Sequence, residues 1–336
     1  MTEAGGNGFQ LCNLFARGQG LDPIGYAGTL DAFLAFEVPL PWPRGIFESR
    51  SKLPAEAREA LEWFQRELPF RLRSLVIGPD PQYSQPGMRR VVWWARPDGP
   101  MSEYGSAEYL VPQESMGQLV AALVRSGGRA EDFADYRTEA HGRNLLVCTH
   151  GTQDAACGRF GVPLYRRLRS RAGEAGCRVW RVSHFGGHLF APTLLELPSG
   201  RLWAYLEDDS AELLLEERGD ADELRDKYRG WAALEGPFLQ ALERELLARE
   251  GWEWLRLPKS GRTIEQDPSA DPRWALVELT VWRDRGVEVH TARVEVDGFL
   301  DVRPRSDSQE VKPYAQYRVA SLSLTEGTAS DVQAVA

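Results

Sequence analysis

The chain has 336 residues, of which 43% are hydrophobic and 26% charged, so it has enough apolar side chains for two domains with sizeable cores. Its formal net charge of −9 at pH 7 argues against a protein that coats nucleic acid or binds an anionic membrane, because both need clustered positive charge. Four cysteines in so long a chain argue against the dense disulfide framework of a small secreted module. We therefore expect proteins or small molecules as partners.

The N-terminal residues and the apolar segments favour a cytoplasmic protein. Residues 1–8 contain no basic start that leads into an apolar stretch of signal-peptide length. The most apolar segment, residues 33–40, is interrupted by Glu37 and Pro39, so it is too short to span a membrane. We expect a soluble, cytoplasmic protein without a membrane span.

The first 140 residues combine strand-like runs with one helical pattern. The strand-like runs lie at residues 30–38, 73–77 and 90–95. Residues 55–68 carry apolar side chains at helical spacing, and Pro54 stands at the start of this pattern. This combination predicts an N-terminal α/β region over residues 1–140.

Residues 141–232 follow the order strand, helix, strand, loop, hairpin, helix. The predicted elements are strands at 144–147 and 177–182, a helix at 164–172, hairpin strands at 193–197 and 201–206, and a helix at 220–228. This is the order of the thioredoxin fold. Such folds place a proline, often cis, just before the third strand, and Pro192 stands there; the sequence leaves its isomer open.

The remainder of the chain predicts an α+β extension over residues 233–325. A helical pattern covers residues 238–249, and two alternating strands at 275–282 and 287–296 flank a hairpin-like turn. Residues 326–336 are small and polar, which predicts a frayed tail.

Two of the four cysteines and three of the five histidines lie between positions 148 and 188. Cys148 and Cys157 are separated by eight residues, and His184 and His188 by three. Cys148 ends a predicted strand, Cys157 precedes a helix, and both histidines follow the next strand, so we expect all four at one carboxyl edge of a sheet. Thiolates and imidazoles together are typical of zinc or iron–sulfur sites.

The spacing argues against several common sites. Structural zinc sites use closely spaced cysteine pairs, and Gly186 and Gly187 disfavour the helix that two histidines at this spacing would need. A Rieske centre has the pattern C-x-H followed by C-x-x-H. Cys148 and His150 match the first half, but the second half fails because Gly158, Arg159 and Phe160 follow Cys157. A C-x-x-C dithiol is absent. Zinc, a two-iron cluster and two metal-free structural thiols remain open on spacing alone.

Several segments of the chain resemble one family. They are LVCTHG at residues 146–151 with Asp154 and Cys157, SHFGGHLFAP at 183–192, RGW at 229–231 and IGYAGT at 24–29. Together they resemble the sucrase/ferredoxin-like family, which belongs to the thioredoxin-like ferredoxins. The family often has Arg where Gln153 stands and a second Cys where Ala156 stands, so local hydrogen bonding and the reduction potential are expected to differ.

The resemblance implies a [2Fe–2S] cluster bound by Cys148, Cys157, His184 and His188. It implies electron transfer with a redox partner protein, and the second nitrogen of each histidine ligand could couple electron uptake to proton uptake. Whether the chain is itself an enzyme stays open, and glycoside hydrolysis is not supported because no pair of carboxylates stands out.

Two other functions compete with the electron carrier. One is a redox, pH or iron sensor that uses the same cluster, and the other is a zinc-stabilised, non-redox binding protein. His150 is either an outer hydrogen-bond donor or a loop cap. The arginine-rich residues 159–181 either dock an acidic partner or form a solvated helix face, and Cys12 and Cys177 are expected to be buried.

Overall fold

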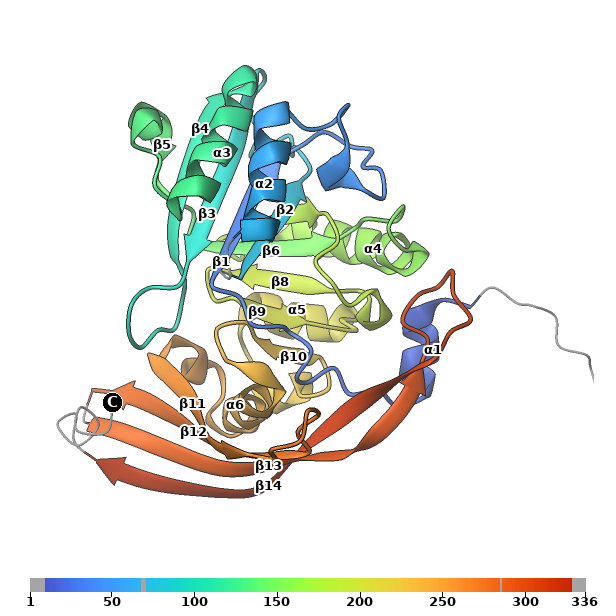
Figure 1. Ribbon diagram of the computed structural model, residues 1–336, viewed down its shortest axis with the longest axis vertical. Coiled ribbons are helices and arrows are strands. Elements are labelled where there is room, and N and C mark those ends of the chain that lie inside the picture. Colours follow the sequence, from blue (N-terminus) through green and yellow to red (C-terminus); the bar gives the residue numbers. More distant parts are fainter. Residues whose placement is uncertain (1–9, 68–70, 285, 328–336) are drawn as a thin grey trace, which may run out of the picture.

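The computed structural model describes residues 10–67, 71–284 and 286–327. These residues form a ten-stranded mixed sheet and a four-stranded antiparallel sheet, with helices packed on both (Figure 1). The strand order of the large sheet is β10-β9-β8-β6-β7-β2-β1-β3-β4-β5. This architecture confirms the predicted α/β fold class.

The N-terminal region supplies one half of the large sheet. Its elements are α1 (Cys12–Gly18), β1 (Ala32–Glu37), α2 (Ala55–Glu67), β2 (Leu72–Ile77), β3 (Met88–Ala95), β4 (Gly105–Pro112), α3 (Met116–Ser126) and β5 (Arg137–Thr138). The predicted strands at 30–38, 73–77 and 90–95 and the helix at 55–68 correspond to β1, β2, β3 and α2. The prediction missed β4 and α3.

Strand β1 is buried along its whole length because helices cover both faces of the sheet. Ala32, Leu34 and Phe36 pack with residues of α2 and α3. Phe33 and Ala35 point to the opposite face and join the other core cluster, where the ring of Phe33 packs edge-on against that of Tyr104. The alternation of side chains along one strand therefore divides the core into two layers.

The second half of the sheet has the predicted thioredoxin-like order. Its elements are β6 (Arg143–Cys148), α4 (Ala155–Arg171), β7 (Cys177–Val182), η4 (His188–Phe190), β8 (Leu194–Leu197), β9 (Arg201–Trp203), α5 (Asp208–Glu216), η5 (Ala221–Leu224) and β10 (Tyr228–Trp231). Strands β6 and β7 are parallel, and β8 pairs antiparallel with β6. The peptide bond before Pro192 is cis.

The helix predicted over residues 220–228 is wrong. Only the short turn η5 forms there, and the last helix of this region is α5, where Glu207 and Ser210 form a reciprocal cap. Gly219 separates the two, and Tyr228 belongs to β10, where its side chain is buried in the sheet. The helical spacing of residues 220–228 therefore reflects a single 3-10 turn, which buries Ala221 and Leu224, followed by a strand.

Helix α4 starts nine residues before its predicted position at residue 164. Gly158, Gly161 and Pro163 lower the helix propensity of its first half, which hides this half from a propensity argument. Asp154 starts the helix because its carboxylate accepts a hydrogen bond from the backbone N–H of Ala156.

The two halves of the sheet meet where β2 and β7 run side by side. Only Ile77 and Val182 form a regular pair there. The backbone N–H of Ser183 donates to the Val76 carbonyl at 2.9 Å, and the N–H of Val76 donates to the Ser183 hydroxyl at 3.1 Å. The Ser183 side chain thus adds a hydrogen bond to a junction in which β2 and β7 share one regular residue pair.

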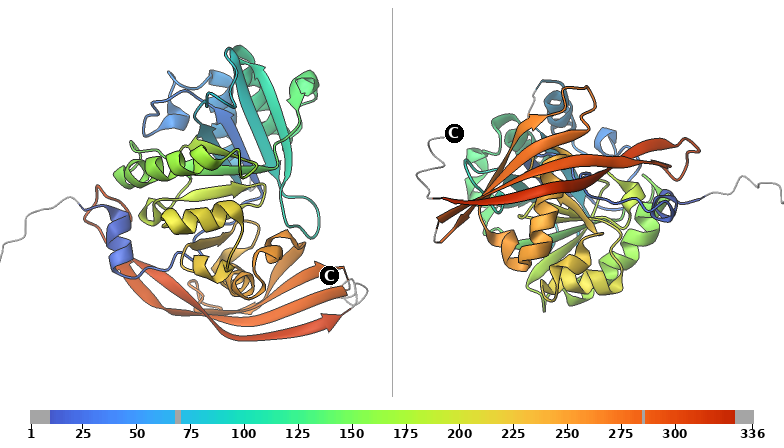
Figure 2. Two further views of the ribbon diagram at one scale, coloured as in Figure 1. Left: turned by 180° about the vertical axis from the view of Figure 1, so that it is seen from behind. Right: turned by 90° about the horizontal axis from the view of Figure 1, so that it is seen from below.

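The C-terminal region forms the second sheet, which curves around α6 (Figure 2). Its elements are α6 (Gly236–Glu250), β11 (Lys259–Gln266), β12 (Trp274–Arg283), β13 (Gly286–Val302) and β14 (Lys312–Gly327). The strands predicted at 275–282 and 287–296 correspond to β12 and β13. Of the predicted tail, Glu326 and Gly327 lie in β14, and residues 328–336 lie outside the described residues.

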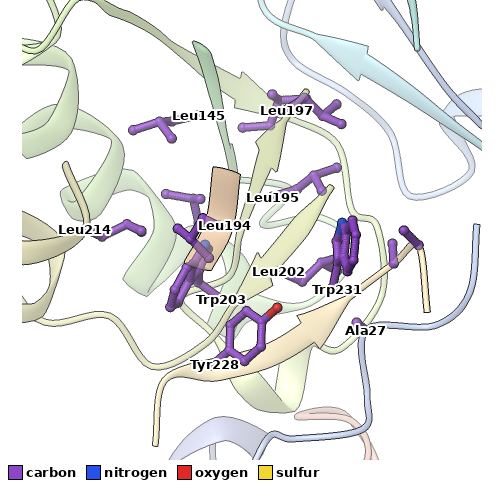
Figure 3. Close-up of a cluster of buried hydrophobic side chains, with 14 of the residues drawn as sticks. Ala27, Leu145, Leu194, Leu195, Leu197, Leu202, Trp203, Leu214, Tyr228 and Trp231 are labelled. Atoms are coloured by element: carbon purple, nitrogen blue, oxygen red, sulfur yellow. The ribbon is translucent and has the colours of Figure 1, made fainter. Parts of the chain in front are cut away.

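Short 3-10 helices complete the secondary structure of the described ranges: η1 (Ile46–Glu48), η2 (Gln113–Ser115), η3 (Glu131–Tyr136) and η6 (Trp252–Arg256). The core between β8, β9 and β10 is aromatic. Trp203 and Tyr228 lie with ring centroids 4.9 Å apart, and Trp231 packs near Leu202 (Figure 3). These aromatic side chains fill the core on this half of the large sheet.

Candidate metal centre

The structure brings three of the four predicted ligands together. Cys148 ends β6, Cys157 lies in the first turn of α4, and His184 lies in the loop after β7. The Nδ1 atom of His184 lies 3.8 Å from the Cys148 sulfur and 3.6 Å from the Cys157 sulfur. The three donor atoms all lie within 4.8 Å of one another, close enough to hold one metal centre.

His188 adjoins this group through its ring. The imidazoles of His184 and His188 stack with centroids 4.9 Å apart and an interplanar angle of 26°. A ring nitrogen of His188 groups within 4.8 Å of Cys12 and Asp154, which form a second set of donor atoms. Its Nδ1 atom is buried and has no hydrogen-bond partner among the described residues.

Asp154 and Cys12 are committed to structural contacts. The Asp154 carboxylate accepts hydrogen bonds from the Ala156 N–H at 2.9 Å, from the Ser306 N–H at 2.9 Å and from the Ser306 hydroxyl at 2.7 Å. Burial raises the pKa of the Cys12 thiol to about 12. The Asp154 oxygens are already engaged by Ala156 and Ser306, so Nδ1 of His188, which has no partner among the described residues, is the available donor atom of this second set.

The thiols of Cys148 and Cys157 have opposite pKa shifts. Burial opposes ionisation of Cys148, but hydrogen bonds from Cys157 and His184 lower its pKa well below the usual value. The hydrogen bond to Cys148, followed by burial, raises the pKa of Cys157. Cys148 is therefore the more acidic of the two thiols, and a metal that bound both sulfurs would displace their remaining proton.

His150 positions the loop that carries His184. The backbone N–H of His184 donates to Nδ1 of His150 at 3.3 Å, and Nε2 of His150 lies 2.9 Å from the Pro43 carbonyl. These contacts require a neutral ring with its proton on Nε2, and burial lowers the His150 pKa in agreement. The imidazole of His150 therefore accepts a hydrogen bond from the backbone of His184 and holds the histidine loop in place.

Arg229 lies beneath the histidine loop and is buried. Its guanidinium donates to the carbonyls of Gly186 and Tyr26 at 3.3 and 2.7 Å, and its Nε has no hydrogen-bond partner among the described residues. Burial lowers its pKa to about 10, and the negative groups that oppose this shift include the thiols of Cys148 and Cys157. The site therefore contains a buried cation that the described residues leave without an ion pair.

Gly187 makes the approach of Arg229 possible. Its φ angle is +76°, and a Cβ atom there would lie 2.6 Å from a guanidinium nitrogen of Arg229. A side chain at this position would push either the histidine loop or the cation away.

Residues 23–230 match the sucrase/ferredoxin-like family. This chain belongs to that family. It is also 33% identical over 89 residues to "Altered inheritance of mitochondria protein 32" of Kluyveromyces lactis, an alignment that covers 26% of this chain and 26% of that protein. The chain thus spans about a quarter of the length of this relative. No solved structure matches the chain.

Three arginines of the arginine-rich segment of this sucrase/ferredoxin-like protein are paired within the molecule. Arg167 and Arg171 pair with acidic residues of α5, including Glu212, and Arg169 forms a bidentate pair with Asp80. Burial of Cys12 and Cys177 is as predicted. Arg159 and Arg166 of the same segment are exposed and form no ion pair with the described residues, so only this part of the segment is open for a partner.

Elements outside the family match cover the site. The loop between β13 and β14 lies against α1 (Figures 1 and 2). The Ser306 hydroxyl accepts a hydrogen bond from the Cys12 N–H at 3.0 Å, and Asn13 donates to the Ala191 carbonyl at 2.9 Å.

None of the described helices is long and apolar enough to cross a membrane.

The sequence analysis assigned no role to Arg229 or Ser306. The sequence could have pointed to Arg229, because this residue belongs to the RGW segment that resembles the family. It could not have pointed to Ser306, because Ser306 contacts Asp154 across 152 positions of the chain.

Proposed function

We propose that this sucrase/ferredoxin-like protein is a one-electron carrier that holds a [2Fe–2S] cluster through Cys148, Cys157, His184 and His188. The convergence of two sulfurs and an imidazole nitrogen within 4.8 Å, with the His188 ring stacked on His184, carries the proposal. When bound, such a cluster supplies reversible uptake of a single electron.

The residues at the site fit this group in two further ways. A buried imidazole nitrogen without a partner is costly, and ligation by Nδ1 of His188 would satisfy it. The buried Arg229 needs negative charge nearby, which a thiolate-bound centre that takes up an electron provides.

The surrounding residues have separate tasks. His150 holds the backbone of His184, while α1 and the loop between β13 and β14 keep water from the buried side. His184 presents Nδ1 to the thiols, which leaves its Nε2 as the atom that can hold or release a proton as the charge of the site changes.

Iron and acid-labile sulfide should be measured with the visible spectrum on anaerobically purified protein and on the His188→Cys variant. We expect about two irons and two sulfides per chain, with a spectrum that shifts but persists in the variant. Cys177→Ala is the control, since Cys177 starts β7 at the other end of the strand, and its metal content should be unchanged. One zinc per chain, or no metal after reconstitution, would overturn the proposal.

A further inference from the structure

A cavity of about 350 Å³ opens beside the candidate metal centre. His150 and His184 form part of its wall, and Ile46, Leu61 and Leu72 form an apolar part. This volume is at the lower end of the range for small-molecule pockets, about 300 to 1,000 Å³. The cavity therefore has the size and mixed lining of a site for a small ligand.

Two arginines line the same cavity: Arg44, which pairs with Asp307, and Arg73 of β2, which has no ion pair with the described residues. Its guanidinium forms no ion pair or hydrogen bond with the described residues, and its Nε atom is buried without a partner. Burial alone lowers its pKa, since no neighbouring carboxylate acts against the shift. Glu48 also lines the cavity, but it is exposed at the rim and does not pair with Arg73.

A guanidinium without an ion pair prefers an anion that accepts two parallel hydrogen bonds, and a carboxylate matches that fork. The apolar wall adds a preference for a ligand with a hydrophobic body. We infer that this cavity binds a small organic carboxylate, with Arg73 holding the carboxylate and the body lying against Leu61 and Leu72. Inorganic phosphate would satisfy Arg73 alone and leave the apolar wall unoccupied.

The lining also places such a ligand in contact with His184. The ligand would thus lie directly against the candidate redox centre and change its surroundings on binding. This second part rests on the proposed function, whereas binding to Arg73 does not.

The test is calorimetric titration of benzoate into the purified full-length protein, whose iron and sulfide content is measured beforehand. We expect saturable binding that weakens about tenfold or more in Arg73→Gln, as loss of a charge-assisted, bidentate contact implies. Arg73→Lys keeps the charge but not the fork and should fall between the two. The control is Arg66→Gln, because Arg66 is an exposed residue of α2 that pairs with Glu62 outside the cavity.

Two further probes separate the charge from the apolar body. Benzyl alcohol should bind more weakly than benzoate and equally to wild type and Arg73→Gln, and inorganic phosphate should bind more weakly than benzoate. Absence of saturable benzoate binding, or equal binding by wild type and both Arg73 variants, would overturn the inference. Thermal unfolding followed by circular dichroism shows whether each variant is folded.

The visible spectrum distinguishes failure of this inference from failure of the proposed function. Benzoate binding to a preparation without iron would support the cavity and overturn the redox centre. An iron-containing protein that does not bind benzoate would support the redox centre and overturn the inference about the cavity. Binding that leaves the spectrum of the iron-containing protein unchanged would overturn the contact with His184 while Arg73 remains the binding residue.

Discussion

A Cβ atom on Gly161 of α4 would lie 1.9 Å from the carbonyl oxygen of Cys148 at the end of β6. The helix and the strand therefore approach so closely that only glycine fits between them. This approach brings the first turn of α4, with Cys157, next to Cys148.

Gly161→Ala is therefore expected to push α4 away from β6 and to separate the two sulfurs. Overpacking of this kind costs about 1–3 kcal/mol of the free energy of unfolding. Urea unfolding and iron content measure the two effects. Gly173→Ala is the matched control, because no atom lies within 4 Å of a Cβ there; equal stability and iron content in both variants would contradict the close approach.

Arg229→Gln should lower the reduction potential of the site. Removal of a buried positive charge makes an added electron less favourable, and a tenfold change in the one-electron equilibrium corresponds to about 59 mV. Protein-film voltammetry provides the measurement. Arg229→Lys keeps the charge and should retain most of the potential, so an equal fall in both variants would point to altered packing instead.

The reduction potential should also fall as pH rises above the pKa of the histidine ligands in the oxidised state. A proton taken up with each electron gives a slope of about 59 mV per pH unit. Potentials measured between pH 6 and 10 test this coupling, and a flat profile would reject it. His188→Cys removes one of the two imidazoles and should reduce the pH dependence.

Lys259 makes the stability of the fold depend on pH. Burial, followed by repulsion from Arg201, lowers its pKa to about 6, whereas an unfolded chain has the ordinary value of 10.5. Between these values the unfolded state binds a proton that the folded state does not, so stability rises with pH by up to about 1.4 kcal/mol per unit.

Lys259→Met should therefore gain stability relative to wild type most strongly at pH 6 and below, and the difference should shrink as the pH rises toward 9.5. Urea midpoints at several pH values measure it. Lys52→Met, at a surface position, is the control, and its urea midpoint should change with pH as that of the wild type does. A constant difference across this range would show that Lys259 stays charged over the rings of Trp231 and Trp254.

Ser306→Ala should loosen the cover of the site. The hydroxyl both accepts from the Cys12 N–H and donates to Asp154, so its loss leaves a buried donor without a partner and costs about 1–3 kcal/mol. Hydrogen exchange in α1 should rise. Ser308→Ala, in an exposed part of the same loop, serves for comparison, and equal protection in the two variants would argue against this tie.

The strands that form the centre of both sheets were predictable because their apolar side chains recur with a period of two or run without interruption. Strands β11 and β14 were missed, since much of their length is exposed and polar. Cys148 and Cys157 could be placed together because each flanks a predictable element. The roles of Arg73 and Arg229 were not predictable, because the lack of a partner is a property of the folded surroundings and leaves no mark on the local sequence.

The tie between Ser306 and the Asp154 region also sets an order of events during synthesis. All four candidate ligands leave the ribosome well before the loop between β13 and β14, which closes over them. A nascent chain thus presents an uncovered site, and a metal that bound before the C-terminal sheet was complete would need no later opening. After the hairpin docks, a metal at this site could exchange only if Ser306 left its contacts with Cys12 and Asp154.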